Sequence, residues 1–278
     1  MLYFFDSHAH LSSARLGNAE LRRIRLRNAL RANVRGVLVP AVDPASWDAI
    51  ELHIPEWGRV FPSMTFAYGL GLHPYVIPEI PSQNDDLLLS ELEDRVRARP
   101  EGLRAVGECG LDFGFDREHH ARQARIFARH AQIAKAHDLP LVVHCVRAHG
   151  ALLELLEQAG HPPAVIHAFT GSAELAARYC RHGHVLGFGG ALTLPNVRRA
   201  REAVRAVPEA ALLIETDAPD QTPFARRPAV NEPAFVVDVA QAVADARGET
   251  LEWVARVTDA NARRVFGLPP VRASSDLP

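Results

Sequence analysis

The chain has 278 residues, of which 47% are hydrophobic and 23% are charged, as in an ordinary folded protein. Its formal net charge is −2, so composition alone does not predict a strongly basic nucleic-acid-binding protein. Three cysteines, an odd number in a long chain, argue against a disulfide framework. Neither a cleavable leader nor an apolar run of about 20 residues is evident. We therefore expect a cytoplasmic protein with no membrane span.

Short apolar or β-branched runs alternate with amphipathic segments along the whole chain. The predicted strands span residues 3–9, 36–42, 65–71, 103–109, 140–146, 164–169, 185–190 and 211–217. The predicted helices span residues 18–33, 45–57, 84–97, 117–137, 149–159, 172–182, 196–206, 231–246 and 249–265. Eight strands, each followed by a helix, predict an α/β fold of the (β/α)8 type, the TIM barrel. We expect a single barrel domain over residues 1–268 and a tail over residues 269–278.

Polar residues suited to metal or acid–base chemistry fall at the carboxyl ends of the predicted strands. They are Asp6, His8 and His10 on the first strand, then His73, Glu108, His144, His167 and Asp217 on the third, fourth, fifth, sixth and eighth. The active sites of such barrels lie at this end of the strands. Because residues two apart on a strand face the same side, His8 and His10 can both point into one mouth of the barrel.

Six of these residues form a candidate metal site: His8, His10, Glu108, His144, His167 and Asp217. Burying them without partners would be costly, and divalent cations such as zinc, manganese or magnesium remove that cost. Six ligands exceed the needs of one tetrahedral centre, so we expect two ions bridged by a carboxylate. A bridging carbamylated lysine is not expected, because the only lysine, Lys135, lies in a predicted helix. Glu108 is left as the bridge.

Six short segments occur in an order that resembles one known family. They are "DSHAH" (6–10), "GLHP" (71–74), "GECGLD" (107–112), "LPLVVH" (139–144), "HAFTGS" (167–172) and "ETDAPD" (215–220). Together they resemble the TatD family of metal-dependent deoxyribonucleases, in the amidohydrolase superfamily, from residue 3 to about residue 267. The resemblance implies a (β/α)8 barrel with one to three divalent ions. It also implies that His8, His10 and Asp217 bind one ion, with His144 and His167 on the second and Glu108 between them.

Three residues are expected to act in catalysis: Asp217, Glu108 and His73. Asp217 is expected to take the proton of the attacking water, although a role as ligand only stays open. His73 precedes Pro74 in a turn, where it can donate a hydrogen bond to a substrate oxygen or simply cap the loop. Asp6 is expected to orient an imidazole from behind.

Three arginines are candidate contacts to substrate phosphate, because guanidinium groups bind phosphate bidentately. Arg147 follows the fifth strand, and Arg226 and Arg227 follow the eighth. Arg147 is the one expected to bind substrate, together with His73.

The predicted function is hydrolysis of DNA phosphodiester bonds by a metal-activated water. The same site could instead hydrolyse a carbon ester or amide, such as a lactone or an aminoacyl-tRNA ester, because fold and metal do not choose between phosphorus and carbon. The near-neutral charge mildly favours this alternative. A binding barrel without catalysis would be expected to lack a ligand, and none of the six is missing. We expect DNA ends or another phosphate or ester substrate as partner, and no obligate protein partner.

Overall fold

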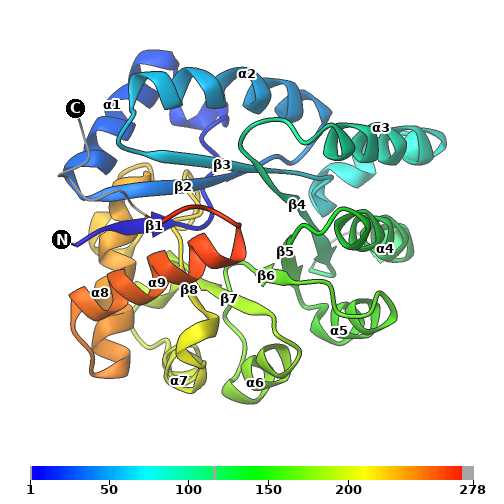
Figure 1. Cartoon of the computed structure of the whole chain (residues 1–278). Coiled ribbons are helices and arrows are strands. Elements are labelled where there is room, and N and C mark those ends of the chain that lie inside the picture. The colour runs from blue at the N-terminus through cyan, green and yellow to red at the C-terminus, as the bar shows by residue number, and fades with distance from the viewer. Residues whose placement is uncertain (1, 115–116, 271–278) are drawn as a thin grey trace.

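The computed structural model of the chain describes residues 2–114 and 117–270. Within these residues, eight strands form one parallel sheet in which the spatial order equals the chain order. The strands are β1 (Phe4–Asp6), β2 (Val34–Pro40), β3 (Thr65–Leu70), β4 (Leu103–Asp112), β5 (Leu141–Val146), β6 (Ala164–Ile166), β7 (Val185–Phe188) and β8 (Leu212–Ile214). Figure 1 shows them as a ring with the helices outside.

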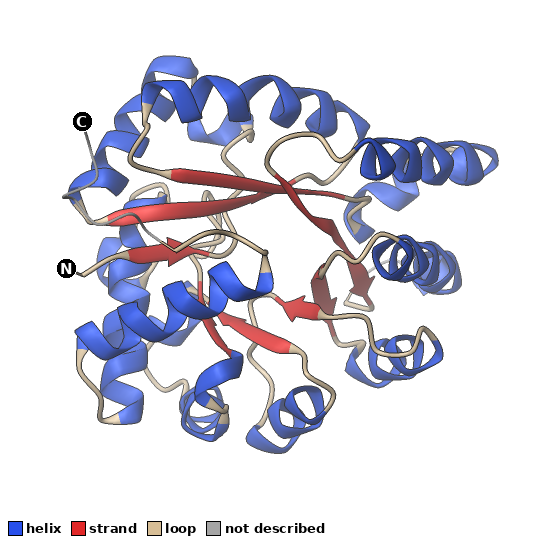
Figure 2. Cartoon of the chain, in the orientation of Figure 1, coloured by secondary structure: helices blue, strands red, loops and turns tan. Residues whose placement is uncertain are grey.

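The helices follow the strands one by one, as expected for a βα repeat. They are α1 (Ala19–Arg31), α2 (Pro44–Val60), α3 (Asp85–Ala98), α4 (His120–Ala136), α5 (His149–Gln158), α6 (Ala173–Arg181), α7 (Arg198–Ala206), α8 (Val236–Arg247) and α9 (Leu251–Val265). Figure 2 shows this outer layer in blue around the red strands. The predicted TIM barrel is confirmed. Of the predicted tail, residues 271–278 lie outside the described residues, and the domain boundary at residue 268 stays a prediction.

The barrel closes between β8 and β1 through backbone hydrogen bonds beyond the ends of both strands. Ser7 N donates to Ile214 O at 3.1 Å, Asp217 N to His8 O at 2.8 Å, and His10 N to Ala218 O at 2.8 Å. This pairing makes His8 and Asp217 neighbours although 208 positions separate them in the chain. It also explains why β1 and β8 are shorter than predicted: their last residues bond to each other in an irregular ladder.

The outer helix α9 covers this closure. It contacts both β1 and β8, and in Figure 1 it crosses in front of them. The Phe266 ring, directly after α9, stacks on Phe5 of β1 with centroids 6.1 Å apart. Among the described residues, the helices are all too short or too polar to cross a membrane.

The turn after β3, which carries His73, is held by buried polar contacts. The Trp47 indole donates from Nε1 to Gly71 O at 2.8 Å, and Leu72 N donates to His130 Nε2 at 3.0 Å. His130 Nδ1 lies 2.8 Å from Ile126 O, so both ring nitrogens are paired. Sequence patterns place His130 on a helix as a surface or packing residue. It is fully buried and fixes the backbone next to His73.

Candidate metal centre

The six predicted ligands meet at the carboxyl end of the barrel. His8 and His10 follow β1, Glu108 lies within β4, His144 lies within β5, His167 directly follows β6, and Asp217 lies three residues after β8. Glu108 was expected at the end of its strand. Instead β4 continues to Asp112, and its pairing with β5 shifts register between Val106 and Cys109. Such irregularities redirect a side chain, and here the residue at the irregularity is Glu108.

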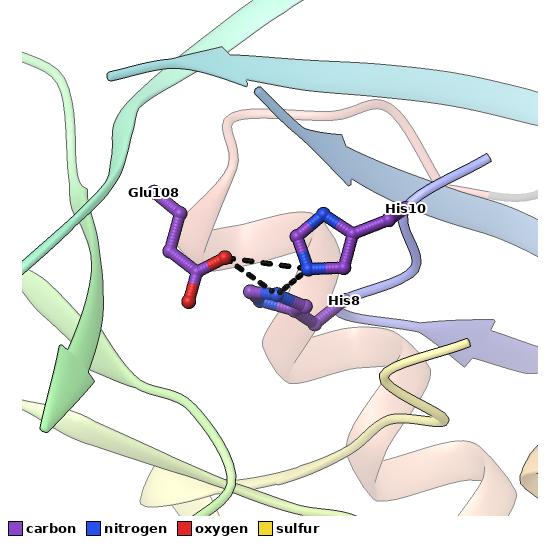
Figure 3. Close-up of side chains that lie close together, drawn as sticks. All are labelled: His8, His10 and Glu108. Atoms are coloured by element: carbon purple, nitrogen blue, oxygen red, sulfur yellow. Dashed lines mark hydrogen bonds and ion pairs between the residues drawn. The ribbon is translucent and has the colours of Figure 1, made fainter. Parts of the chain in front are cut away.

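The two carboxylate oxygens of Glu108 contact different histidines. Its Oε2 lies 3.2 Å from His8 Nε2 and 3.4 Å from His10 Nε2. Figure 3 shows these two imidazoles, which come from one segment, facing the carboxylate from β4. Its Oε1 lies 2.8 Å from His167 Nε2 and 3.4 Å from His144 Nδ1. Oε1 also lies 3.2 Å from His73 Nε2. The two oxygens of one carboxylate therefore face two different sets of histidine nitrogens.

Asp217 completes the first of these sets. Its Oδ1 lies 3.5 Å from His10 Nε2 and 3.7 Å from His8 Nε2. Its Oδ2 accepts a hydrogen bond from Gln221 Nε2 at 2.7 Å. One oxygen is thus held by the protein, while the other points at the two histidines.

The ligand atoms are arranged as a cation would require. His8 Nε2 and His10 Nε2 lie 3.2 Å apart, and Glu108 Oε2 is buried without accepting a hydrogen bond from any described residue. Atoms close enough to share one ion form three groups: His8, His10 and Glu108; His8, His167 and Asp217; His73, Glu108 and His144. Buried nitrogen and carboxylate oxygen atoms that converge on one place suit a divalent cation. The residues fit a metal centre.

The charges in this cluster support the same conclusion. Burial opposes ionisation of Glu108, but its electrostatic interactions with the imidazoles of His73, His167 and His8 outweigh burial and hold the pKa of the carboxyl well below its usual range. Burial likewise opposes ionisation of Asp217, and a hydrogen bond from His10 is the main cause of its lowered pKa. Both carboxylates are therefore negatively charged at neutral pH, as cation ligands must be.

A family described as TatD related DNase matches residues 5–267. The chain belongs to the TatD family. It is a metal-dependent hydrolase, as are the curated relatives that it matches along nearly their whole length. It is 32% identical over 266 residues to the uncharacterized metal-dependent hydrolase YabD of Bacillus subtilis, covering 94% of this chain and 98% of that protein.

Two further matches extend this result. Over 210 residues the TatD-family chain is 36% identical to a protein of Citrobacter koseri named 3'-5' ssDNA/RNA exonuclease TatD, covering 71% of this chain and 76% of that one. The crystal structure of YjjV, a TatD homologue from Escherichia coli, superposes with a TM-score of 0.87 at 28% identity, covering 96% of this chain and 98% of that one. The family resemblance read from the six sequence segments is confirmed.

In this TatD-family chain, two carboxylates that were not predicted lie behind the second pair of histidines, and the one behind His144 is hydrogen-bonded to it. Asp112 Oδ2 lies 2.9 Å from His144 Nε2, and Glu215 Oε1 lies 3.4 Å from His167 Nδ1. A histidine that donates one ring N–H to a carboxylate presents the lone pair of its other nitrogen to a cation. Both acids lie in segments that carry the family resemblance, "GECGLD" and "ETDAPD", which was the only signal available.

His73 differs from His144 and His167 because its outer ring nitrogen accepts a hydrogen bond. Its Nδ1 accepts a hydrogen bond from Tyr75 N at 3.0 Å and caps the short helix that follows, so the loop-capping role is confirmed. The proton of the neutral ring must then be on Nε2, which lies 3.2 Å from Glu108 Oε1. Burial lowers the pKa of His73 and favours this neutral form. In this tautomer His73 presents a donor to the centre of the site.

The prediction that Asp6 orients an imidazole is wrong. Its Oδ1 accepts from Thr216 N at 2.9 Å and from His8 N at 3.3 Å, and its Oδ2 accepts from Thr216 Oγ1 at 2.6 Å. These donors are backbone and hydroxyl groups. Asp6 therefore joins β1 to the segment after β8, because β1 ends at Asp6 and the side chain turns toward the neighbouring strand.

The metal centre forms the floor of a cavity of about 940 Å³. The three arginines predicted as phosphate contacts are not among the described residues that line it. Arg147 is exposed, Arg226 donates from Nε to Asp238 Oδ2 at 2.9 Å, and Arg227 donates from Nε to Thr222 O at 3.2 Å. Their part in substrate binding stays a prediction. Lys135 lies within α4, as predicted, and its Nζ donates to Ala159 O at 2.9 Å.

Proposed function

We propose that this protein hydrolyses phosphodiester bonds of DNA with two divalent cations held side by side by Glu108. The observation that carries this proposal is that the two oxygens of this carboxylate face different histidines: Oε2 faces His8 and His10, and Oε1 faces His144 and His167, with His73 beside them. The Citrobacter koseri relative is named an exonuclease of single-stranded DNA and RNA, which supports nucleic acid as the substrate. His8, His10 and Asp217 would hold one cation, and His144 and His167 the other. Zinc, manganese and magnesium are the candidate ions, because the donor set mixes nitrogen with oxygen.

When bound, such cations make a water acidic and stabilise negative charge on the phosphate oxygens. The chain's own residues have separable tasks around them. Asp112 holds His144 in the tautomer that leaves a lone pair toward the centre, and Glu215 places a carboxylate 3.4 Å from Nδ1 of His167. Gln221 fixes Asp217, so the carboxylate keeps one orientation.

Asp217 is the residue best placed to accept the proton of the attacking water. It is ionised at neutral pH, because hydrogen bonding from His10 and the charges of nearby histidines outweigh its burial. Its Oδ1 faces the same space as His8 Nε2 and His10 Nε2. His73 acts as a hydrogen-bond donor, whereas Asp217 is an acceptor. The His73 Nε2–H can donate to a phosphate oxygen as negative charge develops there.

Hydrolysis of a carbon ester or amide is the second candidate function. Arg15 is the only arginine among the described residues that line the cavity, and no described lysine lines it. Proteins with a long nucleic-acid footprint normally carry a basic stripe. The cavity therefore also suits a small ester, such as a lactone.

The test uses Asp217→Asn and, as a matched control, Asp86→Asn, an exposed acid that pairs with Arg125. We expect Asp217→Asn to slow hydrolysis of single-stranded DNA by at least about 100-fold while its metal content is largely kept, and the control to behave as wild type. Aminoacyl-tRNA and lactones complete the substrate panel. Full cleavage by a metal-free preparation, or faster turnover of a carbon ester than of DNA, would overturn the proposal.

A further inference from the structure

A single ion pair forms part of the cavity wall beside the metal centre. Arg15 Nη1 donates to Asp220 Oδ2 at 2.7 Å, and Arg15 Nη2 donates to Asp220 Oδ1 at 2.8 Å, so the pair is bidentate. The Arg15 side chain is 65% exposed and that of Asp220 is 50% exposed. Both residues line the cavity. The guanidinium is thus presented to whatever enters.

Each member of this pair is joined by short backbone connections to ligands of the same predicted cation. Ser13 N donates to His10 O at 3.0 Å, and Ser13 Oγ accepts from Arg15 N at 3.3 Å. On the other side, Asp220 N donates to Asp217 O at 2.8 Å. The backbone segments that carry the pair are therefore tied to those of His10 and Asp217, next to the candidate metal centre.

The charged side chains that line the cavity are mostly acidic, and Arg15 is the exception. The described residues that line the cavity include four carboxylates: Asp43, Glu108, Asp217 and Asp220. Arg15 is the only guanidinium or ammonium group among them. Phosphates that flank the scissile bond can reach few cations outside the metal centre. A bidentate guanidinium is the group that matches phosphate geometry best.

Building on the proposed function, we propose that Arg15 determines specificity by binding one phosphate next to the scissile one, and that Asp220 occupies Arg15 when no substrate is present. The incoming phosphate replaces the Asp220 carboxylate, since both offer two oxygens to the same fork of N–H groups. An exposed ion pair is weak enough to be exchanged in this way. The substrate is then bound outside the metal centre by one flanking phosphate and not by a long basic surface.

This exchange predicts opposite effects for the two partners. Arg15→Gln removes the phosphate contact and should raise the KM for a single-stranded dT decamer about 10-fold, with kcat little changed. Asp220→Asn removes the competing carboxylate and should lower the KM about 2- to 5-fold. If the pair were only a brace for the loops, both substitutions would weaken the enzyme in the same direction.

A matched control comes from helix α3, away from the cavity. Arg97 Nη1 donates to Asp94 Oδ1 at 2.6 Å, with side chains 61% and 64% exposed. Arg97→Gln and Asp94→Asn remove the same charges from an equally exposed pair, and should leave the KM unchanged. Bis(p-nitrophenyl) phosphate, which carries only the scissile phosphate, should be hydrolysed equally by wild type and Arg15→Gln.

Two further readouts keep the inference separate from the proposed function. The slope of log KM for the decamer against log salt should flatten by roughly 0.7 in Arg15→Gln, the value for one phosphate contact on a single strand. The Kd of a labelled phosphorothioate dT decamer, measured by fluorescence anisotropy, should be lowest for Asp220→Asn, higher for wild type and highest for Arg15→Gln. If wild type binds the decamer without cleaving it, the proposed function fails while these Kd values still test Arg15. Equal Kd values and salt slopes in wild type and Arg15→Gln overturn the inference, as does a wild type that binds no decamer.

Discussion

The Asp112→Asn substitution tests the proposed second cation site. Asp112 uses both oxygens: Oδ2 lies 2.9 Å from His144 Nε2, and Oδ1 accepts from Gly114 N at 2.8 Å. Asparagine has the same shape but only one acceptor oxygen, so one of these two N–H donors must face an amide NH2 group. His144 then loses the partner that keeps the lone pair of its Nδ1 turned toward the centre, or the loop at Gly114 loses its anchor.

The expected cost falls mainly on one cation. Loss of the carboxylate behind a ligating histidine typically weakens metal binding by about 10- to 100-fold, or about 1.4–2.7 kcal/mol. His8, His10 and Asp217 do not contact Asp112 in any hydrogen bond or ion pair found among the described residues. The other cation should be weakened less, because its own ligands keep all their partners, although both cations share Glu108.

Calorimetric titration of the metal-free protein with zinc or manganese measures both binding events. We expect two events in the wild type and selective weakening of one in Asp112→Asn. Asp86→Asn, at a 94% exposed carboxylate on α3, serves as the control and should match wild type. Unchanged binding in Asp112→Asn, or equal weakening of both events, would refute this account of the second site.

Two predictions concern stability. Burial lowers the pKa of His130 from 6.5 to about 4, so the unfolded chain binds this proton at a higher pH than the folded one. As the pH is lowered from about 6.5 to 4, His130 thus reduces the free energy of unfolding by about 1.4 kcal/mol per pH unit, with no such effect above that window. Urea unfolding of His130→Gln at several pH values should show a flatter dependence of the free energy of unfolding on pH. An unchanged pH dependence contradicts the assignment. Gly110 has a φ of +145°, and a Cβ there would lie 2.0 Å from His144 O; Gly110→Ala should therefore lower the free energy of unfolding by more than about 3 kcal/mol in denaturant titrations. Gly150→Ala, whose Cβ meets nothing within 4 Å near the start of α5, is the control and should be neutral or slightly stabilising.

The sequence was sufficient for the fold and for the six proposed ligands because both depend on local regularities. Strand and helix segments of the right length repeat eight times, and the carboxyl ends of parallel strands must lie together. A histidine at such an end can therefore be placed without coordinates. Glu108 is a partial exception, since only the structure shows the register shift that lets its two oxygens face different histidines.

The remaining contacts depend on distances that no sequence pattern contains. Asp6 was expected to orient an imidazole because it lies next to the two histidines in the sequence, but β1 ends at Asp6 and its carboxylate bonds to Thr216. Asp112 belongs to a quoted motif, yet its partner His144 is on the next strand. Arg15 meets Asp220 only because the loops after β1 and β8 adjoin at the closure of the barrel.

The most direct test of the central claim titrates metal back into one chelated preparation while hydrolysis of single-stranded DNA and bound metal are both measured. We predict that activity is absent without metal and rises to a plateau as two ions bind per chain, and that Glu108→Gln, which has one acceptor oxygen in place of two, does not reach this plateau. Full activity without metal, or a wild-type plateau in Glu108→Gln, would contradict a centre built on Glu108.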